Sequence, residues 1–257
     1  ELRTATQALL PQLRADHEVA AALCRKMGMR SCKELREAKD IRWGGKGLTA
    51  ADLALLGTLG SVLPALESLI LVDEDTSAGP DGMQRLAEGL GAGALPAVTW
   101  VELDHVHVDN AGASALAAAL GRGALPRLMT LSLYATAIGD AGLVALAPAL
   151  RRLPALEQLY FMGDPLSHEG LAALVAPPPP ADAPPPTTGG LTKLKVLYLS
   201  HTQVTDAGCA TLAAAIDSGA LPALETVYLS DNPATTAAKA AVREALAKWK
   251  GTWKAAV

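Results

Sequence analysis

The chain has 257 residues, of which half are hydrophobic but only 4% are aromatic. Its formal net charge of −4 is mild, so composition alone favours neither nucleic acid nor a charged membrane surface as a partner. The longest apolar runs are shorter than the roughly 18 residues that a spanning helix needs, and we therefore expect no transmembrane segment.

Cys24, Cys32 and Cys209 are odd in number, far apart in the sequence and without CxxC spacing. This pattern predicts neither a disulfide framework nor a zinc site, and it fits an intracellular protein in a reducing compartment. Because the sequence begins at Glu1 rather than at a methionine, we expect a processed or trimmed form. Both the cytoplasm and an organelle reached by a removable targeting peptide fit that form.

Residues 1–37 are expected to form short helices that cap one end of the core. Pro11 breaks the first apolar stretch and Asp16 is placed to cap the next helix. Ser31 and Glu34 have the spacing of a capping box for a third helix.

A pattern of one short strand and one helix then recurs over residues 38–234. The strand half alternates apolar residues, as in Leu131 and Leu133, and the helix half has apolar residues at helical spacing, as in Leu143 and Leu146. We call the residue that closes each strand segment the marker position, and successive markers are 28, 32, 30, 28, 38 and 30 residues apart. The seven markers are Lys46, Glu74, Val106, Thr136, Asp164, Thr202 and Asn232. Neither half buries its apolar face alone, so stacked copies are expected to form an α/β solenoid with one parallel sheet.

Units such as LPRLMTLSLYATAIGDAGLVALAPAL and LTKLKVLYLSHTQVTDAGCATLAAAI resemble leucine-rich repeats of the long, ribonuclease-inhibitor type. The resemblance implies a horseshoe of about seven repeats, with parallel strands on the concave face and helices on the convex face. The family usually has asparagine or cysteine at the marker, whereas this chain has Val106 at one of these positions. We therefore expect an irregular turn after Leu103.

Polar residues also recur where each helix begins. Asn110, Asp140 and Asp206 each precede an Ala-Gly pair, and His168 takes the same place before Glu-Gly. An Asn or Asp side chain there is expected to accept hydrogen bonds from free N–H groups at a helix start, which makes a metal site unnecessary to explain the spacing.

Two segments lie outside the regular repeat. The proline-rich insertion 177–190 is expected to loop out, either as a passive insertion or as a ligand for a proline-binding domain. Residues 235–257 are expected to form a C-terminal helical cap and tail, because Val242, Leu246 and Trp249 have helical spacing.

Catalytic motifs are missing from the sequence. Phosphate-binding glycine loops, HExxH and GxSxG are not found, and His105 and His201 fall three strands apart, too far to share a metal. These observations predict a protein that is not an enzyme and that uses no cofactor and no metal.

The predicted concave face has an unusual composition. The strand residues that alternate with the core include all the tyrosines, three of them on consecutive strands, and acidic residues outnumber basic ones after the first strand. Tyrosine supplies large contact area with a hydrogen-bonding tip, and an acidic surface disfavours phosphate backbones. The predicted partner-binding residues are Trp100, Glu102, Asp104, Tyr134, Tyr160, Met162, Tyr198, His201, Tyr228 and Asp231.

The sequence thus favours a non-enzymatic module that binds a protein with basic features and no nucleic acid, in an oligomeric state left open. One alternative is a structural or accessory subunit held in a larger assembly, including an organellar one, through the caps, the convex helices or the proline-rich loop. A second alternative is a regulator of a small GTPase, which rests on the family resemblance alone.

Overall fold

The protein, described by a computed structural model, is a single row of seven strand–helix units. The structure describes residues 17–47, 49–72, 78–176 and 190–255. Its seven strands pair in parallel, each with the next in the sequence, and are β1 (Asp40–Gly44), β2 (Ser68–Val72), β3 (Trp100–Glu102), β4 (Thr130–Ser132), β5 (Gln158–Tyr160), β6 (Val196–Tyr198) and β7 (Thr226–Tyr228). Its helices after residue 31 are α2 (Cys32–Glu37), α3 (Ala50–Leu59), the 3-10 turn η1 (Gly60–Val62), α4 (Gly79–Gly89), α5 (Asp109–Gly121), α6 (Asp140–Leu150), α7 (His168–Val175), α8 (Asp206–Asp217) and α9 (Thr236–Ala255).

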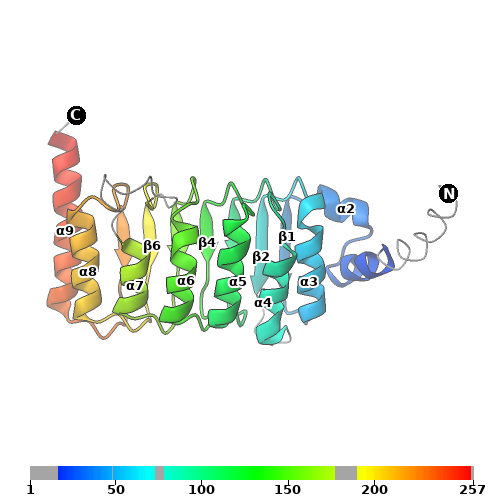
Figure 1. The fold of residues 1–257 in the computed structure, drawn as a ribbon, viewed down its shortest axis with the longest axis horizontal. Coiled ribbons are helices and arrows are strands. Elements are labelled where there is room, and N and C mark those ends of the chain that lie inside the picture. The colour runs from blue at the N-terminus through cyan, green and yellow to red at the C-terminus, as the bar shows by residue number, and fades with distance from the viewer. Residues whose placement is uncertain (1–16, 48, 73–77, 177–189, 256–257) are drawn as a thin grey trace.

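The helices form one layer and the strands a second layer behind it (Figure 1). Consecutive helices pack against each other, and the sheet is open and uncurled. The solenoid fold and the parallel sheet expected from the repeats are therefore confirmed. One face of the sheet is covered by helices, and the opposite face, which we call the sheet face, has no helix of the described residues over it.

The core lies between the two layers and is filled by the alternating apolar residues of each strand. Leu131 pairs in register with Val101 on one side and Leu159 on the other, and all three are buried. The helices contribute the facing side chains, such as Leu143 and Leu146, which are fully buried. Truncation of a leucine in such a column to alanine costs about 2–5 kcal/mol, because the neighbouring repeats cannot close the cavity.

The marker positions form a hydrogen-bonded column between repeats. Asp164 accepts hydrogen bonds from the backbone N–H groups of Thr136 (2.9 Å) and Ile138 (3.2 Å) and from the Thr136 hydroxyl (3.2 Å). Asn232 accepts from the Thr202 hydroxyl (2.7 Å) and from the Val204 N–H (3.2 Å), and its amide donates to the Leu199 carbonyl (2.6 Å). Burial raises the pKa of Asp164 to about 7, although these donors act in the opposite direction.

The turn after Leu103 is irregular, as the valine at its marker predicts. Val106 is buried and offers no polar group, and the N–H groups of Val108 and Asp109 donate directly to the Thr136 carbonyl instead. Asp109 then adopts φ of 51°, in the left-handed region, whereas the equivalent Gly139 and Ser167 have φ of −95° and −111°.

The polar residues at the helix starts act between repeats rather than within their own helix. Asn110 Oδ1 accepts from the N–H groups of Gly139 (2.9 Å) and Gly142 (3.0 Å), which begin the following helix. Asp140 likewise accepts from Ser167 N–H (2.8 Å) and Gly170 N–H (3.0 Å). Glycine is required at Gly170 because a Cβ there would lie 2.6 Å from Asp140 Oδ1. Capping was predicted, but the helix that is capped is the next one along the chain.

The two ends of the row differ. At the N-terminal end, helical residues 17–26 and α2 precede β1, and they bury Leu23, Cys24 and Leu35 in the common core. The Ser31 side chain caps α2 by accepting a hydrogen bond from Glu34 N–H. At the C-terminal end, α9 continues the row of helices beside α8, and its Trp249 indole donates to the Pro222 carbonyl (3.0 Å). Pro11, Asp16, Glu74 and most of the proline-rich insertion, 177–189, lie outside the described residues.

Two of the three cysteines lie close together in space. Helix 17–26 and α2 bring the sulfur atoms of Cys24 and Cys32 to 3.9 Å, although both thiols are free. Burial, followed by contact with Cys32, raises the pKa of Cys24 to about 11, and burial also raises the pKa of Cys209. The fold thus brings together two cysteines that lie eight residues apart in the sequence.

Candidate binding surface on the uncovered face of the sheet

The sheet register places the predicted surface residues in straight columns across the strands. Arg42 pairs with Ile70, Ile70 with Glu102, and Glu102 with Ser132. The same column continues through Tyr160, Tyr198 and Tyr228. A parallel sheet in regular register keeps equivalent residues of successive repeats side by side, so one column gathers neighbours that lie 28 to 38 positions apart in the sequence.

Tyr160, Tyr198 and Tyr228 form a stack that we call the tyrosine ladder. The ring centroids of Tyr160 and Tyr198 are 4.5 Å apart with planes 13° from parallel, and those of Tyr198 and Tyr228 are 3.9 Å apart at 9°. The Tyr160 hydroxyl donates to Gln158 Oε1 (2.7 Å). A hydrogen bond with Tyr228, together with burial, raises the pKa of Tyr198 to about 12, so its hydroxyl remains protonated. The outer ring is the most open, since Tyr228 is 41% exposed.

A second group, which we call the β3–β4 cluster, comprises Trp100, Glu102, Asp104, His105 and Tyr134. Trp100 is 38% exposed, and its indole N–H donates to Glu102 Oε2 (3.2 Å). Asp104 accepts from the hydroxyl of the buried Ser132 (2.6 Å) and from Tyr134 N–H (3.3 Å). His105 meets Tyr134 edge to face at 4.7 Å between centroids. The cluster therefore presents an indole and a phenol beside two carboxylates.

The charge of the sheet face is partly balanced by ion pairs between neighbouring repeats. Glu67 pairs with Lys39 (3.0 Å) and Glu157 with Lys195 (2.8 Å), and each pair raises the pKa of its lysine, chiefly through the hydrogen bond. The carboxylates of Glu102 and Asp104 accept only neutral donors in the hydrogen bonds described above. The β3–β4 cluster thus holds two carboxylates that take no part in these two ion pairs.

The predicted residues fall into these two groups, with three others around them. Met162 is half-buried on the segment after β5, between the two groups. His201 and Asp231 lie beyond the ends of β6 and β7, where His201 Nε2 is 3.3 Å from Asp231 Oδ2 and both side chains are exposed. Gln158 and His105 were not among the predicted surface residues, although Gln158 bonds Tyr160 and His105 packs against Tyr134. The signal for Gln158 is its position two residues before Tyr160, which places it on the same face of the strand.

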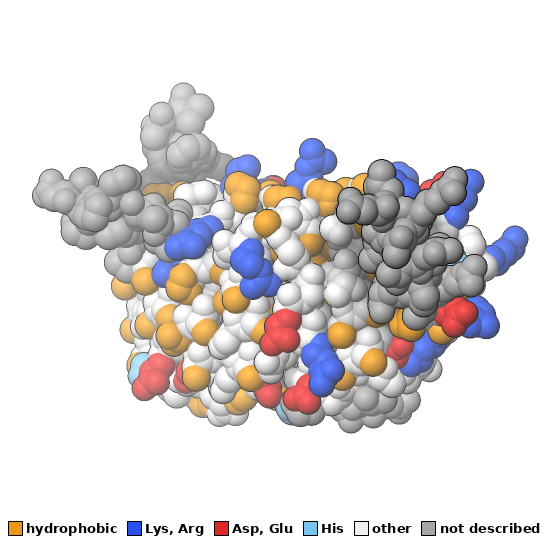
Figure 2. Space-filling view, turned by 45° about the vertical axis from the view of Figure 1, so that its right-hand side comes forward, with side chains coloured by type: hydrophobic (Ala, Val, Ile, Leu, Met, Phe, Trp, Pro, Cys, Tyr) orange, Lys and Arg blue, Asp and Glu red, His pale blue; other side chains and the backbone are white. Residues whose placement is uncertain are grey.

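The helix-covered side looks different. In Figure 2, which shows that side obliquely, hydrophobic side chains lie scattered between charged and uncoloured groups. Val144 of α6 is 48% exposed. Among the residues that the structure describes, no three His, Cys, Asp or Glu side chains gather as a metal site would require. Within the same residues, no helix combines the length and the apolar character needed to cross a membrane.

Comparison with known proteins identifies one repeat unit. A family model described as "Leucine Rich repeat" matches residues 190–213, which include β6 and the start of α8. No curated protein matches the chain. Among solved structures, a protein from Bacteroides fragilis aligns over 87% of this chain and 67% of its own length, with 14% identity and a TM-score of 0.48.

The strand–helix unit that the family model matches recurs along the described sheet, which supports a leucine-rich repeat architecture for the chain. Repeat proteins of this kind serve generally as protein-interaction modules, which use the extended surface that stacking creates. The ribonuclease-inhibitor type stays a prediction from repeat length.

Proposed function

We propose that this protein binds a partner protein over its sheet face, with the tyrosine ladder and the β3–β4 cluster as the two main contact areas. The observation that carries the proposal is the gathering of every tyrosine, together with Trp100, on the side of the sheet that no described helix covers. Strand propensity explains tyrosine in strands, but it does not explain three tyrosines in one column of consecutive repeats.

The physical reason is that aromatic side chains contribute most to protein interfaces when they are held in place. Stacking fixes the rings of Tyr160 and Tyr198, and hydrogen bonds orient the hydroxyl groups of Tyr160, Tyr198 and Tyr228. An immobilised side chain costs about 0.5–1.5 kcal/mol on binding, and a ladder that is already ordered avoids much of this cost. The ladder is therefore suited to act as a binding hot spot.

The β3–β4 cluster favours a partner with basic or amide-rich features. Glu102 and Asp104 present carboxylates beside the exposed Trp100 ring. An Arg or Lys side chain of a partner would meet both an anion and an aromatic face there. The acidity of this cluster opposes binding of a phosphate backbone.

Affinity capture from the native extract, with purified variants as bait, tests the proposal. The test variant is Tyr160→Ala combined with Tyr198→Ala, and the matched control is Val144→Ser, which removes an exposed apolar group from the opposite side. Circular dichroism first establishes that both fold. A partner held by the sheet face is retained by the wild type and the control and is lost with the ladder variant.

The captured partner is then titrated against each variant by calorimetry. We expect the ladder variant to weaken binding by about 30-fold or more, which corresponds to 2 kcal/mol at hot-spot residues. We expect Glu102→Gln to weaken it less and to reduce its dependence on salt. Equal capture by all variants would sink the proposal and would favour attachment through the caps, helices or proline-rich loop, as a structural subunit requires.

A further inference from the structure

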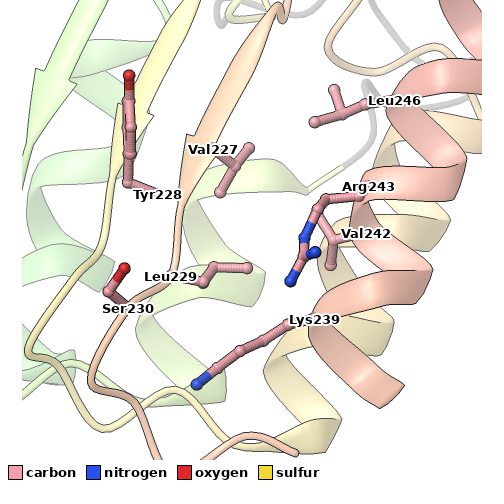
Figure 3. A pocket seen from close by; sticks show the side chains of 8 residues that line it. All are labelled: Val227, Tyr228, Leu229, Ser230, Lys239, Val242, Arg243 and Leu246. Carbon is pink, nitrogen blue, oxygen red and sulfur yellow. The ribbon is translucent and has the colours of Figure 1, made fainter. Parts of the chain in front are cut away.

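The last strand leaves an open edge next to a groove, and this end of the molecule is distinct from the sheet face. β7 pairs with β6 on one side, and within the part of the chain that the structure describes no strand pairs with its other side. The groove, about 270 Å³ in volume, lies between β7 and α9. Figure 3 shows Val227 and Leu229 pointing from the strand toward α9, with Lys239 and Arg243 reaching back from the helix.

The hydrogen-bond series along the sheet shows what the open edge lacks. In four successive repeats the inward-facing residue at the strand end donates its N–H to a carbonyl of the next strand, at 2.9 to 3.0 Å. These donors are Leu103, Leu133, Phe161 and Leu199. Leu229 has the same place directly after β7, but no further strand among the described residues receives its N–H. An unpaired edge of this kind is a template for an added strand.

The groove has an apolar floor. Val242 and Leu246 of α9 face Leu229 and Val227 across it. In the interior repeats this space is filled by the paired apolar residues of the next strand, such as Leu197 and Leu199 for the fifth repeat. A segment with alternating apolar residues would fill it in the same way.

The walls of the groove carry charges that the interior repeats lack. Lys239 occupies the position of α9 that is equivalent, in the preceding helices, to four buried residues. These are Ala113, Leu143, Leu171 and Cys209. Arg243 occupies the position of α9 that is equivalent to Ala117, Ala147, Val175 and Ala213 in the preceding helices. Lys239 Nζ donates to the Asn232 carbonyl (3.0 Å), whereas no carboxylate lies within ion-pair distance of Arg243 among the described residues. An ordinary repeat would bury these two cations without partners, at high cost.

We propose that the open edge of β7 receives an extended acidic peptide segment of another protein as an eighth strand. The backbone of the segment would pair with Leu229 and Val227, its inward apolar residue would cover the groove floor, and its inward carboxylate would meet Arg243. A residue at the register of Tyr228 would cover the exposed ring at the end of the tyrosine ladder, as Tyr228 itself covers Tyr198 at 3.9 Å. Charge favours an acidic peptide over a second copy of this chain at the β7 edge. Two copies joined edge to edge through β7 would bring Lys239 and Arg243 of one copy close to Lys239 and Arg243 of the other, and these cations would repel one another.

The test uses a fluorescein-labelled probe peptide, VYESVYE, in which valine and glutamate alternate with tyrosine and serine. Fluorescence anisotropy measures its binding to the full chain, to Arg243→Glu and to the matched charge reversal Arg127→Glu, which is exposed ahead of β4. We expect binding to the wild type and to Arg127→Glu, and a loss of about tenfold or more with Arg243→Glu, which corresponds to 1.4 kcal/mol. The peptide VYKSVYK should show the reverse preference and bind Arg243→Glu better.

A second peptide, methylated on the backbone nitrogens of one edge at a time, tests strand pairing. Methylation of the edge that faces β7 should abolish binding, and methylation of the opposite edge should not. The proposal is overturned if VYESVYE fails to bind at about 1 mM, if Arg243→Glu binds it equally well, or if neither methylated edge matters. Concentration-dependent self-association in the ultracentrifuge that the peptide inhibits would assign the edge to a second copy instead. The Tyr160→Ala and Tyr198→Ala variant separates this proposal from the sheet-face proposal, since it should leave peptide binding intact.

Discussion

Replacement of Asp164 by asparagine tests the energetics of the marker column. Asp164 is buried, and burial raises its pKa to about 7 from a value of 3.8 in the unfolded chain. Between about pH 4 and pH 7 the folded protein holds a proton that the unfolded chain has released. The free energy of unfolding therefore falls as the pH rises through this range and becomes level above it.

The difference of about 3 pKa units corresponds to about 4 kcal/mol at 1.36 kcal/mol per unit, as an upper bound. The chain itself shows that asparagine fits the position, because Asn232 accepts from Thr202 and Val204 and donates to Leu199 at the equivalent place. In Asp164→Asn the new amide would donate to the Leu133 carbonyl, which already accepts from the Thr136 hydroxyl (3.3 Å). We expect the variant to be more stable than the wild type at pH 8, by up to about 4 kcal/mol, and nearly equal to it at pH 5.

Urea unfolding followed by circular dichroism at several pH values measures this difference. Asp140→Asn is the matched control. Burial, the largest influence, would raise the pKa of Asp140, but hydrogen bonds from Ser167 and Gly170 outweigh it and the pKa is lowered. Its stabilising contribution is lost only as the pH falls below about 4, so the effect of Asp140→Asn should be constant from pH 5 to 8. If Asp164→Asn is less stable at every pH, or if its difference from the wild type does not change with pH, the amide donors hold Asp164 ionised and the reasoning is refuted.

Three further predictions concern contacts between repeats and the thiols. Gly170→Ala should lower the free energy of unfolding by about 1–3 kcal/mol, because its Cβ would lie 2.6 Å from Asp140 Oδ1. The control Gly91→Ala should change this free energy by less than about 0.5 kcal/mol, because a Cβ there meets nothing within 4 Å. Equal effects of the two variants in urea unfolding would contradict the close approach at Gly170. Asn110→Ala should cost about 1–2 kcal/mol in the same assay, because the N–H groups of Gly139 and Gly142 lose their acceptor; no change would mean that water replaces the side chain fully. Iodoacetamide should modify Cys32 in the folded protein but should reach Cys24 and Cys209 only after unfolding, because these two thiols are buried and burial raises their pKa. Modification of Cys209 in native buffer, detected by mass spectrometry, would argue against its burial.

Much of the fold follows from the sequence, because repetition supplies information that a single unit lacks. A strand such as Thr130–Ser132 has only three residues and gives little signal alone. Seven units with the same alternation fix the strand direction, the order and the register together, since equivalent residues must lie side by side. This is why the column of Tyr160, Tyr198 and Tyr228 is predicted correctly.

Contacts that cross from one repeat to the next were harder to predict. The spacing of Asn110 and Asp140 before glycine indicates a cap, but it does not reveal that the capped helix is the following one, because this depends on the offset between adjacent helices. The pairing of Glu157 with Lys195 was also missed, although both occupy the same place in consecutive repeats. Charges counted along the sequence therefore overstate the acidity of the sheet face.

The same regularity explains why the ladder forms at all. Parallel strands lie about 4.8 Å apart, close to the separation at which aromatic rings stack, so tyrosines in one column of consecutive repeats must meet face to face. The observed centroid distances of 4.5 Å and 3.9 Å show that the rings tilt or shift only slightly to close the gap. The ladder stops at Tyr228 because the sheet stops there, and the exposed ring and the unpaired edge of β7 are two results of the same termination. A partner strand that continues the sheet would satisfy both at once, whereas a partner on the sheet face alone would leave the edge unpaired.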